Sequence, residues 1–364
     1  MIRLPLIAMI AMLLGLAAAA MAASPPAAPR TNGNHAGPTD VGIWYCTYFR
    51  QDWTSVVGYT KAKNYRPLCS DRPGDFRHYA SDDVKVIDFH LRKMAEAKID
   101  FLLIELTPGG LGGYRNPGWS DDVYMVDCAR VVCKRIKAWN ATHRWKLRYA
   151  LGVCTHLREA DPWGVAIEKI ARDVYATFYN NPEYGGPANY YQIDGKPLMV
   201  NYGIRLRELK SEWDAYTGDK TYGSRFVQRT LTGYAEPGEY GWPLPLHQGT
   251  LLHPEVELVE PGFNVHRPTE VEPREGGEFY RRCWQRVLDN PRPLIVMIQA
   301  FNDYLEESAV WTTDTSGLDE TQEKWIGPDG KPATSLYWEL TREYIAKLRQ
   351  PSTLRQAPAG HGRR

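Results

Sequence analysis

The sequence predicts an α/β protein with one structured domain, a (β/α)8 TIM barrel. Apolar strand-like runs alternate with segments of helical periodicity, and this alternation implies a parallel sheet covered by helices. Eight such runs are present, one of them weak, and eight strand–helix units close a barrel. The chain has 364 residues, 43% of them apolar and 24% charged, which suits one such domain. A doubly wound sheet is the alternative, but no Gly-x-Gly-x-x-Gly or Gly-x-x-x-x-Gly-Lys pattern follows a strand.

The expected strands are, in chain order, 41–49, 99–106, 145–153, 196–203, 225–233, a weak one within 242–252, 256–263 and 293–301. Apolar residues recur at helical spacing over 84–94, 166–174, 280–288 and 337–348. Asp161 and Pro162 are expected to be the N-cap and the first residue of the second of these helices.

The two ends of the chain depart from this alternation. Residues 1–23 carry one cation, Arg3, and an apolar run that ends in small residues, which is typical of a secretory signal peptide cleaved near Ala22 or Ala23. An uncleaved membrane anchor is the alternative. Residues 24–40 are expected to form a flexible linker and 351–364 a disordered tail, which leaves 41–350 for the barrel. The sequence therefore predicts a secreted or periplasmic protein with no membrane attachment after cleavage.

Composition excludes several partners. Lys and Arg total 44 against 43 Asp and Glu, so nucleic acid is not an expected partner, and we expect a monomer. No Cys-x-x-Cys, His-Glu-x-x-His or EF-hand spacing occurs, so no metal or other cofactor is expected. In an exported chain the six cysteines are disulfide candidates, and their pairing stays open. The 12% of aromatic residues indicate either large core side chains or platforms on which sugar rings stack.

Polar and aromatic residues gather where the expected strands end, which is where barrels of this kind place their chemistry. Charge at the mouth of an apolar strand is costly unless it is paired or used. We therefore expect one oligosaccharide- or polysaccharide-binding site there. Its expected members are Trp44 and Tyr45 on the first strand, Glu105 on the second, Trp119 in the loop after it, Tyr202 on the fourth, and Asn302, Asp303 and Glu306 after the eighth, together with His78.

Asp303 and Glu306 are the expected catalytic pair. If 303–306 turn helically, their Cβ atoms lie about 5–6 Å apart, and two carboxylates at roughly 5 Å suit a retaining glycoside hydrolase. The alternative is structural, because acids in the first turn of a helix interact favourably with its dipole. Glu307 is expected to be a solvated neighbour, and Glu105 either a third carboxylate of the site or the partner of an arginine.

The segments VGIWYCTYF (41–49) and GDFRHYASDDVKVIDFHLRKMAEAKIDFLLIEL (74–106) resemble the opening of glycoside hydrolase family 99. YYQIDGKPLMVNYG, VEPGFN and FNDYLEES are similar to later segments of that family, in the same order, so that the resemblance spans about 41–350. It implies that Asp303 assists the sugar 2-hydroxyl and that Glu306 is the acid/base. Asp303 stands where the family has Glu, Tyr304 where it has Trp and Glu307 where it has Gly, so the substrate or its pose is expected to differ from the family's α-mannoside.

These expectations lead to one main hypothesis, a secreted glycoside hydrolase that cuts within a polysaccharide or glycan. Asn302 would orient one of the catalytic carboxylates, and the aromatic residues of the site would stack on sugar rings. Two alternatives remain open at this point. One is a catalytically silent glycan-binding barrel, and the other is an enzyme of cell-surface polysaccharide assembly.

Overall fold

The structure, a computed structural model, describes residues 38–53, 60–115, 122–154, 161–202, 213–232, 241–243, 255–264, 271–290 and 293–350. The expected signal peptide, the tail and nearly all of the linker lie outside these ranges, as does Trp119. Within the described ranges, no helix combines the length and the apolar character needed to cross a membrane.

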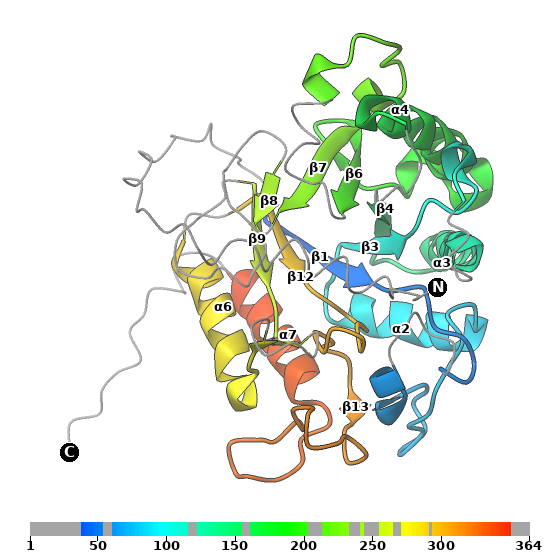
Figure 1. The fold of residues 1–364 in the computed structure, drawn as a ribbon. Helices are drawn as coiled ribbons and strands as arrows, with labels where there is room; N and C mark the ends of the chain where they lie inside the picture. Colours follow the sequence, from blue (N-terminus) through cyan, green and yellow to red (C-terminus); the bar gives the residue numbers. More distant parts are fainter. Residues whose placement is uncertain are drawn as a thin grey trace.

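A parallel sheet forms the centre of the molecule (Figure 1). Its strands follow the order β8-β7-β6-β4-β3-β1-β12-β9, and each neighbouring pair along this path is parallel. The strands are β1 (Asp40–Tyr45), β3 (Phe101–Leu106), β4 (Arg148–Cys154), β6 (Lys196–Tyr202), β7 (Val227–Thr232), β8 (Gly241–Pro243), β9 (Val256–Val259) and β12 (Ile295–Ile298). Each overlaps one expected strand, so the prediction of the strands and of their parallel arrangement is confirmed.

Closure of the barrel stays a prediction. β8 and β9, the two ends of the strand order, lie against each other (Figure 1). Within the described part of the chain, no hydrogen-bonded pairing joins them. Most of the weak sixth strand expected within 242–252 lies outside the described residues. What the structure shows is therefore a single-domain α/β fold around a parallel sheet.

Three small antiparallel pairings lie beside the parallel strands. They join β5 (Gln192–Ile193) to β6, β2 (Arg66–Pro67) to β13 (Thr313–Asp314), and β10 (Phe263–Asn264) to β11 (Val271–Glu272). Short 3-10 helices span Thr60–Asn64, Leu111–Gly113, Pro182–Tyr184, Gly186–Ala188, Gly223–Arg225 and Glu275–Gly277, and a π-helical turn spans Tyr175–Tyr179.

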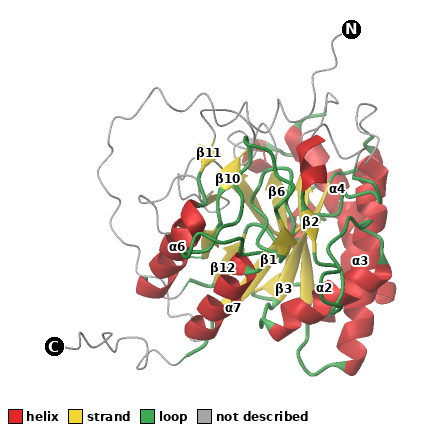
Figure 2. Ribbon diagram, turned by 90° about the horizontal axis from the view of Figure 1, so that it is seen from below, coloured by secondary structure: helices red, strands yellow, loops and turns green. Residues whose placement is uncertain are grey.

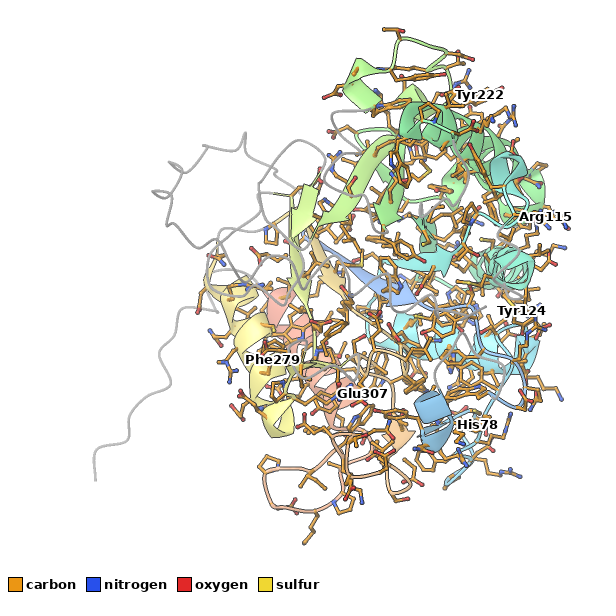
Figure 3. All side chains as sticks on the ribbon, viewed as in Figure 1. His78, Arg115, Tyr124, Tyr222, Phe279 and Glu307 are labelled. Carbon is orange, nitrogen blue, oxygen red and sulfur yellow. The ribbon has the colours of Figure 1, made fainter. Side chains whose placement is uncertain are left out.

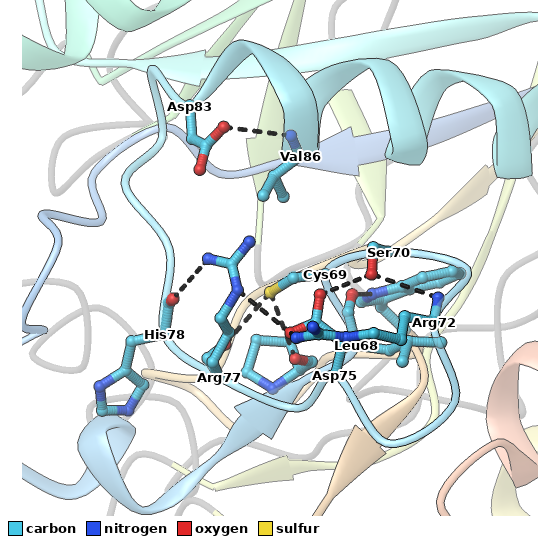
Figure 4. Close-up of polar contacts among 11 residues, drawn as sticks. Leu68, Cys69, Ser70, Arg72, Asp75, Arg77, His78, Asp83 and Val86 are labelled. Atoms are coloured by element: carbon cyan, nitrogen blue, oxygen red, sulfur yellow. Dashed lines mark hydrogen bonds and ion pairs between the residues drawn. The ribbon is translucent and has the colours of Figure 1, made fainter.

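Helices surround the strands, with α3 and α4 on one side and α6 and α7 on the other (Figure 2). They are α2 (Val84–Glu96), α3 (Asp122–Thr142), α4 (Trp163–Val174), α6 (Glu278–Asp289) and α7 (Leu336–Leu348). The stripes predicted at helical spacing are largely buried in α2, α4, α6 and α7, because those faces pack on the sheet. Asp83 begins α2 by accepting hydrogen bonds from the backbone N–H groups of Lys85 and Val86 (Figure 4).

The start of α4 differs from the prediction. Pro162 occupies the N-cap and Trp163 is the first helical residue. Asp161 does not cap the helix, because its carboxylate accepts hydrogen bonds from Lys169 at 2.6 Å and from the Tyr114 hydroxyl at 2.7 Å. Its side chain is therefore engaged with the 3-10 segment and a later turn of α4.

Close packing inside the sheet explains one glycine. Gly42 of β1 is paired with Phe101 of β3 and Met297 of β12. A Cβ atom at Gly42 would lie 2.4 Å from the Phe101 ring and 2.7 Å from the Met297 methyl carbon. Two large apolar side chains therefore fill the space that any other residue would need.

All six cysteines are buried thiols, and none forms a disulfide. Cys46, Cys69 and Cys283 instead lie within hydrogen-bonding distance of oxygen atoms, of a carboxylate in the first case and of backbone carbonyls in the other two. The cysteines that the sequence offers as disulfide candidates are thus buried thiols of the core in this structure.

Candidate active site

Three of the expected site residues share the inner face of the sheet. Parallel partners lie on the same face, and successive residues of a strand alternate between faces. Trp44 pairs with Leu103, two residues before Glu105, so Trp44 and Glu105 lie on one face. Tyr202 reaches the same place from β6, and its hydroxyl donates a hydrogen bond to Glu105 at 3.0 Å. The carboxyl ends of β1, β3 and β6 therefore bring Trp44, Glu105 and Tyr202 together.

Glu105 is the acceptor of three side-chain donors. Its Oε2 atom accepts from the Trp44 indole N–H at 2.7 Å and from the Cys46 thiol at 3.0 Å, and its Oε1 atom accepts from Tyr202. Burial, followed by the negative charge of Asp303, raises the pKa of Glu105 to about 7, although the three donors oppose the shift. Within the described residues no arginine pairs with Glu105. Pairing with an arginine, one of the two expectations for Glu105, is therefore not seen in the described part of the chain, and its membership of a site stays a prediction.

Asp303 lies after β12 and is 7% exposed. Its Oδ1 atom accepts hydrogen bonds from the Tyr48 hydroxyl at 2.9 Å and from the backbone N–H groups of Leu305 and Glu306, both at 3.0 Å. Burial raises the pKa of this carboxyl, and these three donors limit the rise because they stabilise the charged form. Three hydrogen bonds thus orient the Asp303 carboxylate, and its negative charge contributes to the raised pKa of Glu105.

The segment after Asp303 forms a turn and not the first turn of a helix. Within it, Glu306 retains partial exposure, and its carbonyl accepts a hydrogen bond from the backbone N–H of Asn264 at 2.9 Å. Because the donors to Asp303 are the N–H groups of this turn, the carboxylate has the capping role that acids take at helix starts. The structural alternative for Asp303, that its carboxylate stabilises the turn that follows it, therefore has direct support.

The expectation for Glu307 is wrong. Its side chain is buried, with 3% exposure, and its backbone has φ +53° in the left-handed region. Arg274 explains this position, because its guanidinium donates to the carbonyls of Glu307 at 2.5 Å and Ala309 at 2.8 Å. Arg274 itself packs over the rings of Trp325 and Tyr337. A segment far away in the sequence thus turns Glu307 into the protein interior, where Figure 3 shows it beside α7.

Asn302 does not orient a carboxylate, contrary to expectation. It is fully buried, and its amide accepts from the Cys46 N–H at 2.8 Å and donates to the Cys46 carbonyl at 3.0 Å. It also donates to the Tyr79 hydroxyl at 2.9 Å. Asn302 therefore fastens the end of β12 to the segment after β1, and it positions the site only through the backbone.

Two further expected residues lie apart from the carboxylates. Tyr45 follows Trp44 in β1 and so faces outward, where its buried hydroxyl lies 3.1 Å from His90 of α2. His78 lies beside the 3-10 helix at 60–64 (Figure 3), stacked on the Trp53 ring, with its Nε2 atom 2.6 Å from an Arg66 nitrogen. Burial lowers the pKa of His78, and Arg66 lowers it further. Neither position matches the predicted contact with a sugar in the site.

The surroundings of His78 are a polar loop at the edge of the fold. Arg77 donates to the carbonyl of His78 and forms an ion pair with Asp75, whose carboxylate also accepts from the Ser70 hydroxyl (Figure 4). The side chains of this loop bond to one another within the described structure, so the loop has its own internal order. The remaining expected residue, Trp119, lies outside the described residues.

Glu260 is a carboxyl group at the same end of the sheet that sequence reasoning did not assign to the site. It follows β9, is 1% exposed, and has its pKa raised well above the usual range by burial and by the charges of Asp303 and Glu272. Strand alternation could have found it. Glu257 faces outward to Arg286 of α6 at 3.1 Å, so the residue three positions later faces inward.

Tyr48, which donates to Asp303, lies within the expected first strand, 41–49, but after the end of β1, and it is not among the expected members of the site. Within the described residues, no group of His, Cys, Asp and Glu is arranged to hold a metal ion. The chemistry available at this end of the sheet is that of carboxyl groups in differing environments, with aromatic side chains around them.

The chain belongs to the class of α/β proteins built around a parallel sheet, and its candidate site lies at the carboxyl ends of the strands. No family model and no curated protein matches the sequence. Among solved structures, the chain is similar to the GH99 endo-α-mannosidase from Bacteroides thetaiotaomicron, with a TM-score of 0.54 and 14% identity over 85% of this chain and 97% of that chain. The complex of that enzyme with bis-tris propane gives a TM-score of 0.53 and 13% identity over the same shares. At this identity the likeness shows a shared GH99-like fold, which confirms the resemblance drawn from the sequence.

Proposed function

We propose that this protein is a glycoside hydrolase that cuts within a polysaccharide or glycan, at the carboxyl end of the parallel sheet. The observation that carries the proposal is that the buried Asp303 and the partly exposed Glu306 stand in one turn at this end of the sheet, joined by a hydrogen bond from the Glu306 N–H to Asp303, in a fold shared with an endo-α-mannosidase. Glycosidic hydrolysis needs carboxyl groups whose pKa values are pushed apart, one able to give a proton and one that stays ionised.

In this proposal Glu306 is the acid/base residue. It is the carboxylate of the turn that keeps partial exposure, so a leaving-group oxygen or a water can reach it. Asp303 acts on the sugar ring itself, assisting the 2-hydroxyl or stabilising the developing positive charge. Its three hydrogen-bond donors favour the ionised form that either task needs. We further propose a retaining outcome, because Asp303 and Glu306 lie three residues apart in one hydrogen-bonded turn, which is compatible with the short carboxylate separation of retaining enzymes.

Glu105, Trp44 and Tyr202 would bind the sugar next to the scissile bond. Trp44 and Tyr202 meet edge to face, with ring centroids 5.2 Å apart. Their polar groups both point at Glu105. Aromatic edges and a carboxyl group together match a sugar ring, which has apolar C–H faces and hydroxyl donors. We propose an oligosaccharide or polysaccharide as the ligand, and a monomer secreted or exported to the periplasm as the working form.

One observation favours a second candidate function, a glycan-binding barrel without catalysis. Asp303 serves as the cap of its own turn, and a residue with a structural task need not have a chemical one. The test is the release of reducing ends from a panel of polysaccharides by the wild type and by Glu306→Gln. Release that the substitution abolishes supports the hydrolase. Binding without release by either protein supports the silent barrel.

A further inference from the structure

Two polar side chains next to the proposed catalytic pair have no use in the mechanism above. The register pairs Val259 with Ile298, so Glu260 and Gln299, the residues that follow, are neighbours at the carboxyl ends of β9 and β12. The Gln299 N–H donates to the Val259 carbonyl at 2.9 Å, which continues the pairing to this point. Both residues follow inward-facing Leu258 and Met297 by two positions, so their side chains share the inner face with Trp44 and Glu105.

Each of these side chains has one buried oxygen with no hydrogen-bond partner within the described structure, Oε2 of Glu260 and Oε1 of Gln299. A buried polar atom left without a partner costs about 1–3 kcal/mol, and native proteins contain few of them. These two atoms lie on neighbouring strands, on the face and at the end where the proposed site lies. One ligand bound there can supply hydrogen bonds to both oxygens.

We infer that Glu260 and Gln299 form a hydroxyl-recognition pair, which binds vicinal hydroxyl groups of a sugar on the β9–β12 side of the site. The inference rests on the proposed function only in taking a saccharide as the ligand. Sugar hydroxyls both donate and accept, as do a neutral carboxyl group and a carboxamide, so each side chain can exchange hydrogen bonds with one hydroxyl. Glu260 faces Asp303 and Glu272 as its acidic neighbours and Arg274 as its basic one. Its acidic neighbours favour the protonated form, which can donate.

The pair can be removed without changing its shape. Glu260→Met and Gln299→Met keep the length of each side chain and delete its hydrogen-bonding atoms. The control is Glu257→Met, on the same strand but on the outer face, where the carboxylate pairs with Arg286. Binding is measured by calorimetry in the Glu306→Gln background with tetrasaccharides of mannose, glucose and galactose, and melting temperatures are recorded for every variant.

We expect each inner-face variant to weaken tetrasaccharide binding by roughly 3- to 10-fold, the effect of losing one ordinary hydrogen bond. Their melting temperatures should stay level or rise, because each substitution removes an unpaired buried polar atom. Glu257→Met should lower the melting temperature and leave binding unchanged. If a variant does not fold, Glu260→Gln and Gln299→Leu replace it in the same comparison.

Inner-face variants that bind like their Glu306→Gln parent, or that lose stability with unchanged affinity, would overturn the inference, as would a parent that binds no tetrasaccharide. The proposed function fails separately. If the wild type releases no reducing ends while the inner-face variants still bind more weakly, the proposed hydrolase function is overturned and the hydroxyl-recognition pair is supported. If the wild type hydrolyses while the variants bind as tightly as their parent, the hydrolase function is supported and the pair is overturned.

Discussion

The Tyr48 hydroxyl lies 2.9 Å from Oδ1 of Asp303 and donates a hydrogen bond to it. The two residues are far apart in the sequence, and the parallel pairing of β1 with β12 brings them together. This bond acts with the two backbone N–H donors to hold the pKa of a buried carboxyl below the level that burial alone would set. The Tyr48 hydroxyl therefore favours the ionised form of Asp303 against the effect of burial.

Tyr48→Phe tests this dependence. Loss of the hydroxyl should raise the pKa of Asp303 further, because the hydrogen bond lowers it. If activity requires ionised Asp303, the acidic limb of the kcat/KM profile should move to higher pH by about one to two units, the equivalent of one hydrogen bond to a charged group. The measurement is the pH dependence of hydrolysis. A profile of unchanged shape and position would show that the ionisation of Asp303 does not control the rate.

Glu105→Gln tests the other carboxyl through stability. The folded-state pKa of Glu105 is about 7 against an ordinary value of 4.5, so the folded state binds the proton more tightly than the unfolded state. The wild type should therefore lose stability as pH rises from 4.5 to 7, and this loss should be complete above 7. Glutamine lacks this titration, so the variant should gain stability relative to the wild type over the same interval.

Urea unfolding at a series of pH values measures that difference. The matching change at the exposed Glu96 controls for the loss of a carboxylate in general. A difference between Glu105→Gln and the wild type that does not vary with pH would contradict the raised pKa.

The contrast between strands and site shows what the sequence can and cannot specify. Seven of the eight strands are visible as clear apolar runs, because burial on both faces imposes one composition along each of them, whereas β8 (Gly241–Pro243) corresponds to the weak run. Tyr45 lies apart from the candidate site and Glu260 lies at it because successive side chains of a strand point to opposite faces of the sheet. Strict use of this alternation in the sequence would have predicted both positions. The position of the Glu307 backbone depends on Arg274, which donates to its carbonyl across packed segments that no local pattern connects.

Glu307→Gln tests whether Glu307 has a structural role, as distinct from the catalytic role proposed for Glu306 in the same turn. Burial of Glu307, next to Tyr65, predicts a loss of about 1–3 kcal/mol in the free energy of unfolding when its hydrogen-bonding capacity changes. Activity per folded molecule should change little. The check is denaturant unfolding together with rates normalised to folded protein. A large drop in rate at unchanged stability would move the proposed acid/base residue from Glu306 to Glu307.

The most direct measurement of the central claim is the rate of reducing-end release by Glu306→Gln and by the wild type, with melting curves of both. General acid catalysis supplies about 10² to 10⁴-fold, so the substitution should slow turnover by that factor or more while the melting temperature stays within a few degrees. A structural role in the turn would instead cost about a kcal/mol or less of stability and leave the rate nearly intact. A variant that hydrolyses its substrate at close to the wild-type rate would contradict the assignment of Glu306 as the acid/base residue.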